Sequence, residues 1–89
     1  SSGAYNNSDL VRQYQLQCFE LSKQALLANN ENPSDMGTFT FSVSDDAFKA
    51  IAKEIQGLKA RVRKIIAQDR KKATGVHQLN IHLFTNLKK

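Results

Sequence analysis

The residues whose types suit catalysis or metal binding are few, and their spacing keeps them apart. The two histidines, His77 and His82, lie five positions apart in a segment that alternates polar and apolar residues. Successive side chains of a β-strand point to opposite faces, so this odd spacing separates the two imidazoles. They cannot bind one metal ion within a chain, and we predict no metal site.

The single cysteine, Cys18, lies on the apolar stripe of the first helical segment. One cysteine can form neither an internal disulfide nor a cysteine-based zinc site, and we therefore expect a reducing, cytoplasmic compartment. No histidine is near it in sequence, and no basic cluster on that segment would activate its thiol. We interpret Cys18 as a small buried side chain.

The carboxylates offer no catalytic pair. Asp45 and Asp46 follow Ser44 at the start of a helical pattern, where acidic side chains stabilise the helix dipole. Glu54 stands alone, without a second group for general acid–base catalysis. The motifs GxSxG, HExxH and GxGxxG are absent. We therefore predict that this chain is not an enzyme and binds no cofactor.

Length and composition limit the chain to one small domain. Its 89 residues are 40% hydrophobic, which allows only a small core. No apolar run approaches the ~18 residues of a membrane span, and no signal peptide opens the chain, so we expect no membrane partner. Residues 1–7 lack periodicity and are predicted to be a disordered leader or a tag remnant, with a single domain over 8–89.

Two segments have the three- and four-residue spacing of amphipathic helices. The first is predicted at 9–28, with Ser8 as its N-cap. The second is predicted at 45–72, with Ser44 as its N-cap and Gly75 as its C-terminal glycine. Its apolar residues step by 3, 4, 3, 4 and 3, which is coiled-coil spacing and predicts a dimer seam: Phe48, Ile51, Ile55, Leu58, Val62 and Ile65. A helix break at Gly57 is the alternative interpretation.

Two segments, 36–43 and 76–84, alternate polar and apolar residues as half-buried strands do. The predicted fold is therefore α+β (α/β-like) in the order α-β-α-β, with a small two-stranded sheet covered by two helices. Dimerisation could extend this sheet, because two strands alone leave unpaired edges. The apolar faces are expected against the helices, with the packing residues Phe39, Phe41, Leu79, Ile81 and Leu83. The polar face, with Gln78, Asn80 and His82, either contacts a ligand or neighbouring domain or faces solvent, and we favour solvent.

The positive charge is concentrated in the second helical segment. Residues 45–72 hold nine Lys/Arg against four Asp/Glu, a net +5, whereas the rest of the chain has four of each. At 100° per residue, four side chains project away from the seam: Lys49, Lys53, Lys64 and Lys71. This basic row could bind nonspecific nucleic acid or an acidic partner. The simpler interpretation, which we favour, is a solvated helix face.

Two stretches resemble a known family: DMGTFTFSVS at 35–44 and VHQLNIHLF at 76–84. They are similar to the C-terminal domain of unknown function in a bacterial paralogous family of candidate helix-turn-helix transcriptional regulators. The resemblance covers roughly residues 33–87. It implies a cytoplasmic protein whose N-terminal helix-turn-helix-like region is absent here, and it carries over no catalytic residue.

The sequence departs from that family's pattern at three positions. Ser34 stands where Arg is usual, His77 where Tyr is usual, and Thr85 where Pro is usual. The first loses an Arg–Asp contact, and the last frees the end of the predicted strand.

These observations lead to two expectations about function. The first is a noncatalytic dimerisation or effector domain of a candidate bacterial regulator. Its partner would be a second copy of the chain or the N-terminal region of its parent. The alternative is a small basic nucleic-acid-binding module that uses helix 45–72.

Overall fold

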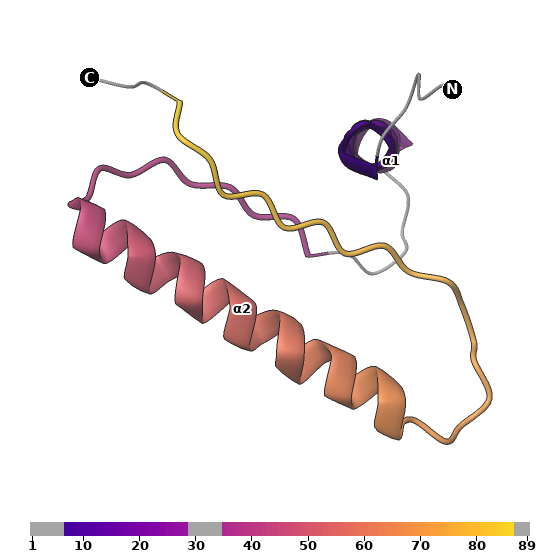
Figure 1. Cartoon of the computed structure of the whole chain (residues 1–89). Helices are drawn as coiled ribbons and strands as arrows, with labels where there is room; N and C mark the ends of the chain where they lie inside the picture. The colour runs from indigo at the N-terminus through magenta and orange to yellow at the C-terminus, as the bar shows by residue number, and fades with distance from the viewer. Residues whose placement is uncertain (1–6, 29–34, 87–89) are drawn as a thin grey trace. The chain divides into compact units, whose positions relative to one another are not determined.

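The computed structural model describes residues 7–28 and 35–86, which contain two helices (Figure 1). Helix α1 is Asn7–Ala28 and helix α2 is Asp45–Gln68. The chain divides into two compact units. One comprises Ser1–Asp35 together with Gln78–His82, and the other comprises Met36–His77 together with Leu83–Lys89. Each unit is described by itself below.

Helix α1 agrees with its predicted bounds at the C-terminal end and begins two residues earlier than predicted. It starts at Asn7 and ends at Ala28, with Asp9 in its first turn. Ser8 therefore lies inside the helix instead of capping it. Of the leader predicted at 1–7, residues 1–6 lie outside the described residues, and Asn7 is the first residue of the helix.

The start of α2 confirms the predicted cap. Ser44 has extended backbone angles, and its Oγ accepts a hydrogen bond from the Ala47 N–H at 3.1 Å. The Ser44 carbonyl accepts from the Phe48 N–H at 2.9 Å, which closes the first turn. Asp45 and Asp46 occupy that turn, where their charges stabilise the exposed N–H groups. The helix is continuous through Gly57, so the alternative of a break there is wrong.

The end of α2 corrects the prediction, because the helix stops at Gln68 and not at residue 72. Asp69 leaves the helix with φ −73° and ψ 116°, and its N–H donates to the Ile66 carbonyl at 3.3 Å. Its Oδ1 accepts from the Lys71 N–H at 3.1 Å. A carboxylate is unfavourable near the negative end of the helix dipole. The hydrogen bond from Lys71 to the Asp69 side chain also gives the backbone an alternative to another helical turn. Gly75 therefore plays no part in ending the helix.

The predicted two-stranded sheet is not formed, and the α+β assignment is wrong. Neither 36–43 nor 76–84 contains a strand in the described part of the chain. Outside the helices, the only backbone–backbone hydrogen bonds of the described residues are the two at the ends of α2. Alternation places side chains on two sides of an extended segment, but a strand requires a hydrogen-bonded partner. Two strands alone are marginal, so the pattern was insufficient evidence for a sheet.

The core of the described chain is very small. Cys18 is the only buried residue there, at 5% exposure, which confirms its predicted burial. Phe39 and Phe41, predicted to pack beneath the helices, are exposed; their rings contact each other with centroids 5.5 Å apart. Residues close together in the sequence therefore determine the helices, while most apolar side chains remain in contact with solvent.

Candidate functional site

A hydrogen-bonded polar cluster of Cys18, Ser22, Gln78 and Asn80 joins α1 to residues 78–82 in the first unit. Asn80 is its centre, because its Nδ2 donates to the Cys18 carbonyl at 2.9 Å and to Ser22 Oγ at 2.6 Å. Ser22 Oγ donates in turn to the same carbonyl at 3.2 Å. Residues about sixty positions apart in the sequence are thereby held together.

Gln78 completes the cluster from the same extended segment. Its Nε2 donates to Asn80 Oδ1 at 3.0 Å and lies 3.4 Å from the Cys18 sulfur, which accepts a weaker hydrogen bond. The Asn80 amide is thus fixed on both its oxygen and its nitrogen. Four polar groups satisfy one another beside the one buried thiol.

An aromatic contact between Phe19 and His82 lies beside the polar cluster in the sequence, one residue after Cys18 and two after Asn80. The rings of Phe19 and His82 lie 4.2 Å apart between centroids, tilted by 58°. Tilted rings at this distance attract each other, and this attraction adds to the stabilisation that comes from burying their surface.

The polar face at 78–82 therefore contacts α1, while Gln78 and His82 remain exposed and Asn80 is half-buried, so the prediction that this face meets solvent holds only in part. Leu79, which was expected to pack against a helix, is 61% exposed. Period-two spacing did identify Gln78, Asn80 and His82 as one face. The pattern could not identify the hydrogen-bond acceptors on α1, because nothing in the sequence distinguishes Cys18 and Ser22 from the other residues of an amphipathic helix.

The polar cluster makes an internal contact between α1 and residues 78–82. The donors of Gln78 and Asn80 and the hydroxyl of Ser22 already have partners inside it. No buried side-chain nitrogen or oxygen in the described ranges lacks a partner. The side-chain N–H donors of Gln78 and Asn80 are thus used within the cluster, and the thiol is covered.

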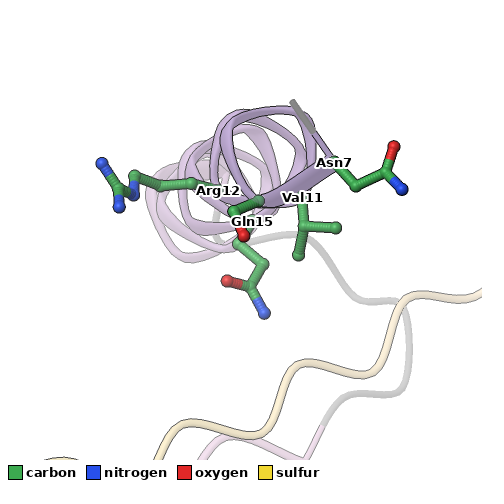
Figure 2. A pocket seen from close by; sticks show the side chains of 5 residues that line it. Asn7, Val11, Arg12 and Gln15 are labelled. Atoms are coloured by element: carbon green, nitrogen blue, oxygen red, sulfur yellow. The ribbon is translucent and has the colours of Figure 1, made fainter. Parts of the chain in front are cut away.

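A shallow hollow on the first turns of α1 is lined by Asn7, Ser8, Val11, Arg12 and Gln15. In Figure 2 the side chains of Asn7 and Arg12 point away from each other, with Val11 and Gln15 between them. All five residues belong to one helix, so no second element closes the hollow. Diverging side chains on one helix cannot surround a ligand, and this hollow is not a binding site.

The basic row is only partly helical. Lys49, Lys53 and Lys64 are exposed on α2, whereas Lys71 lies beyond its end, in the turn that Asp69 forms. Helix α2 itself holds six basic and three acidic residues, a net charge of +3. The structure thus places three of the predicted contact residues on one helix and separates the fourth from them.

The predicted seam of α2 forms an apolar stripe that is incompletely covered. No residue of α2 is buried. Leu58 is 42% exposed and Ile65 is 68% exposed, and the other four members of the stripe are half-buried: Phe48, Ile51, Ile55 and Val62. Helix α1 also exposes large apolar side chains, among them Tyr14, Leu26 and Leu27. The apolar stripe of α2 differs in following coiled-coil spacing without interruption, and it is the candidate functional site.

The two flanks of the apolar stripe differ. Ala52 and Lys59, on one side, are half-buried, whereas Glu54 and Arg61, on the other, are exposed. The Arg61 guanidinium turns back along the helix, and its Nη1 lies 3.2 Å from where a Cβ on Gly57 would stand. Neither Glu54 nor Arg61 has a side-chain hydrogen bond or ion pair within the described residues. The flank with Glu54 and Arg61, which we call the open flank, therefore carries one negative and one positive side chain without a partner among the described residues.

In residues 7–28 and 35–86, no three His, Cys, Asp or Glu side chains gather closely enough to hold a metal ion. No helix there is long and apolar enough to cross a membrane.

Comparison with known protein families gives a match over most of the chain. The model of the family described as Domain of unknown function (DUF4423) matches residues 2–85, which is nearly the whole chain. No curated protein matches the chain, and no solved structure matches it.

Proposed function

This chain belongs to that family, and we propose that it acts as a noncatalytic dimerisation domain that pairs through the apolar stripe of α2. One observation carries the proposal: α2 has six apolar residues at coiled-coil spacing and not one buried residue. Coiled-coil spacing suits a second helix better than an irregular surface, because each side chain enters a hole formed by four residues of its neighbour.

The parent protein that we propose is a cytoplasmic bacterial transcriptional regulator with this domain at its C-terminus. The support is the resemblance at 35–44 and 76–84. A dimerisation domain suits such a protein, because helix-turn-helix regulators bind two half-sites as twofold dimers. The other occupant considered for the stripe is the N-terminal region of the same parent, and solution mass distinguishes the two.

A pair of matched variants tests the proposal. Ile65→Glu places a charge in the exposed part of the stripe, where it costs little in the monomer but must be desolvated in a dimer. Lys64→Glu introduces the same side chain one residue earlier, on the outward face. Sedimentation equilibrium is expected to show dissociation only for Ile65→Glu. Equal masses for both variants and the wild type would contradict pairing through the stripe.

The exposed lysines of α2 favour one second candidate, a nonspecific nucleic-acid surface. If it operates, Lys49→Glu/Lys53→Glu will abolish binding to an arbitrary DNA duplex, while Arg12→Glu/Lys23→Glu on α1 changes the charge equally and leaves binding intact. The wild-type affinity will also fall steeply between about 50 and 200 mM salt. Absence of binding at the lower salt concentration would eliminate this candidate.

A further inference from the structure

The distribution of charge along α2 is strongly uneven. Its first half, 45–56, holds three acidic and two basic residues, a net −1. Its second half, 57–68, holds four basic residues and no acidic residue, a net +4. Packed helices lie about 8–10 Å apart, which is within one Debye length at ~0.1 M salt, so these charges affect one another across an interface.

We infer that α2 pairs with the α2 of a second copy in antiparallel orientation, about a twofold axis at the level between Gln56 and Gly57; this rests on the proposed dimerisation. A parallel pair would place the two +4 halves side by side. The antiparallel pair sets each +4 half beside a −1 half. It also aligns the two helix dipoles favourably, since each positive end lies beside a negative end.

The apolar stripe fits this axis without a mismatch. Phe48 lies at the level of the partner's Ile65, Ile51 at the level of the partner's Val62, and Ile55 at the level of the partner's Leu58. Each layer joins two side chains of different shape, which suits interdigitation. A parallel pair would instead stack Phe48 on the partner's Phe48. It would also place isoleucine at two of the three d positions of the heptad, which are Ile51, Leu58 and Ile65, whereas parallel dimers prefer leucine there.

The charges on the open flank support the same register. The a positions of the heptad are Phe48, Ile55 and Val62. In an antiparallel pair the residues that precede these positions on the two helices face one another. With this axis, Glu54 lies beside the partner's Arg61, and Arg61 beside the partner's Glu54. These are the two charged side chains that border the exposed part of the stripe and have no partner in the described residues. The half-buried flank places Lys59 beside the partner's Ala52, so it brings no like charges together.

Two charge-exchange variants distinguish antiparallel from parallel pairing. Both contain Glu54→Arg and both retain the wild-type net charge. In E54R/R61E the exchange restores opposite charges across an antiparallel pair. In E54R/K59E it restores them only across a parallel pair, where Glu54 would face the partner's Lys59. The measured quantity is the dimer dissociation constant from sedimentation equilibrium, with circular dichroism to confirm that α2 is intact.

We expect E54R alone and E54R/K59E to weaken the dimer about tenfold, because each places two like-charge contacts across the interface. E54R/R61E is expected to stay within about threefold of the wild type. Rescue by K59E instead of R61E would overturn the antiparallel register while leaving dimerisation intact. An unchanged dissociation constant for E54R would show that this flank lies outside the interface and would likewise overturn it. A wild-type chain that is monomeric throughout would overturn the dimer itself.

Discussion

Asn80 Nδ2 lies 2.6 Å from Ser22 Oγ, and this hydrogen bond joins an extended segment near the C-terminus to the middle of α1. The same nitrogen donates to the Cys18 carbonyl. One amide thus connects residues 58 and 62 positions apart. In a unit with a single buried residue, we expect this connection to contribute a large share of tertiary stability.

Replacing Asn80 with alanine is expected to lower the free energy of unfolding by about 1–3 kcal/mol. The change removes two donors and leaves the carbonyl of Cys18 and the hydroxyl of Ser22 with one partner fewer. Denaturant unfolding measures the effect. Asn86→Ala is the control, since Asn86 is exposed and has no side-chain hydrogen bond among the described contacts. If both variants unfold at the same midpoint, the polar cluster does not hold the segment to α1.

The Cys18 thiol is expected to resist a water-soluble disulfide reagent. It is 5% exposed and is covered by Gln78 and Asn80. Because reaction then requires local opening, the native rate should be at least about tenfold below the rate in denaturant. Asn80→Ala should raise the native rate. Equally fast labelling of native and unfolded chains would contradict the burial of Cys18.

Loss of the α2 cap is expected to destabilise that helix. Ser44→Ala removes the acceptor of the Ala47 N–H and should cost about 0.5–2 kcal/mol. Ser42→Ala is the matched control, because Ser42 lies two residues before the cap and makes no described side-chain hydrogen bond. Thermal unfolding of the two variants is followed by far-ultraviolet circular dichroism, which reports helix content. A larger loss for Ser42→Ala would contradict the assigned cap.

Gly57→Ala is expected to stabilise α2 by about 1 kcal/mol, because glycine is the least favourable interior residue apart from proline. The new Cβ would stand 3.2 Å from Arg61 Nη1, the far end of a flexible side chain that can move away. An increase in the thermal midpoint is therefore predicted. A decrease would mean that the close approach of Arg61 to Gly57 is itself needed for stability.

The elements that could be predicted from the sequence depend on neighbours in the chain. The end of α1 at Ala28 and the Ser44 cap follow from residues within about one helical turn. The end of α2 also depends on residues close to it in the sequence. There the basic pair Lys71-Lys72 suggested a last helical turn, while the aspartate two residues before Lys71 could have indicated the side-chain turn that stops the helix.

The features that could not be predicted depend on contacts between distant residues. Alternation at 76–84 identified the faces of an extended segment but not its partner, and the expected sheet did not form. The face with Gln78 and Asn80 reads as solvent-exposed until the acceptors on α1 are known. Those acceptors include a backbone carbonyl, which no side-chain pattern marks.

The apolar stripe of α2 was identified from spacing alone, but its occupant depends on a second molecule. The most direct test is sedimentation equilibrium of the wild-type chain over a wide range of concentrations. We predict a mass that rises with concentration from one chain of 10.0 kDa towards two. A mass of one chain at every concentration, with no dependence on concentration, would contradict the dimer.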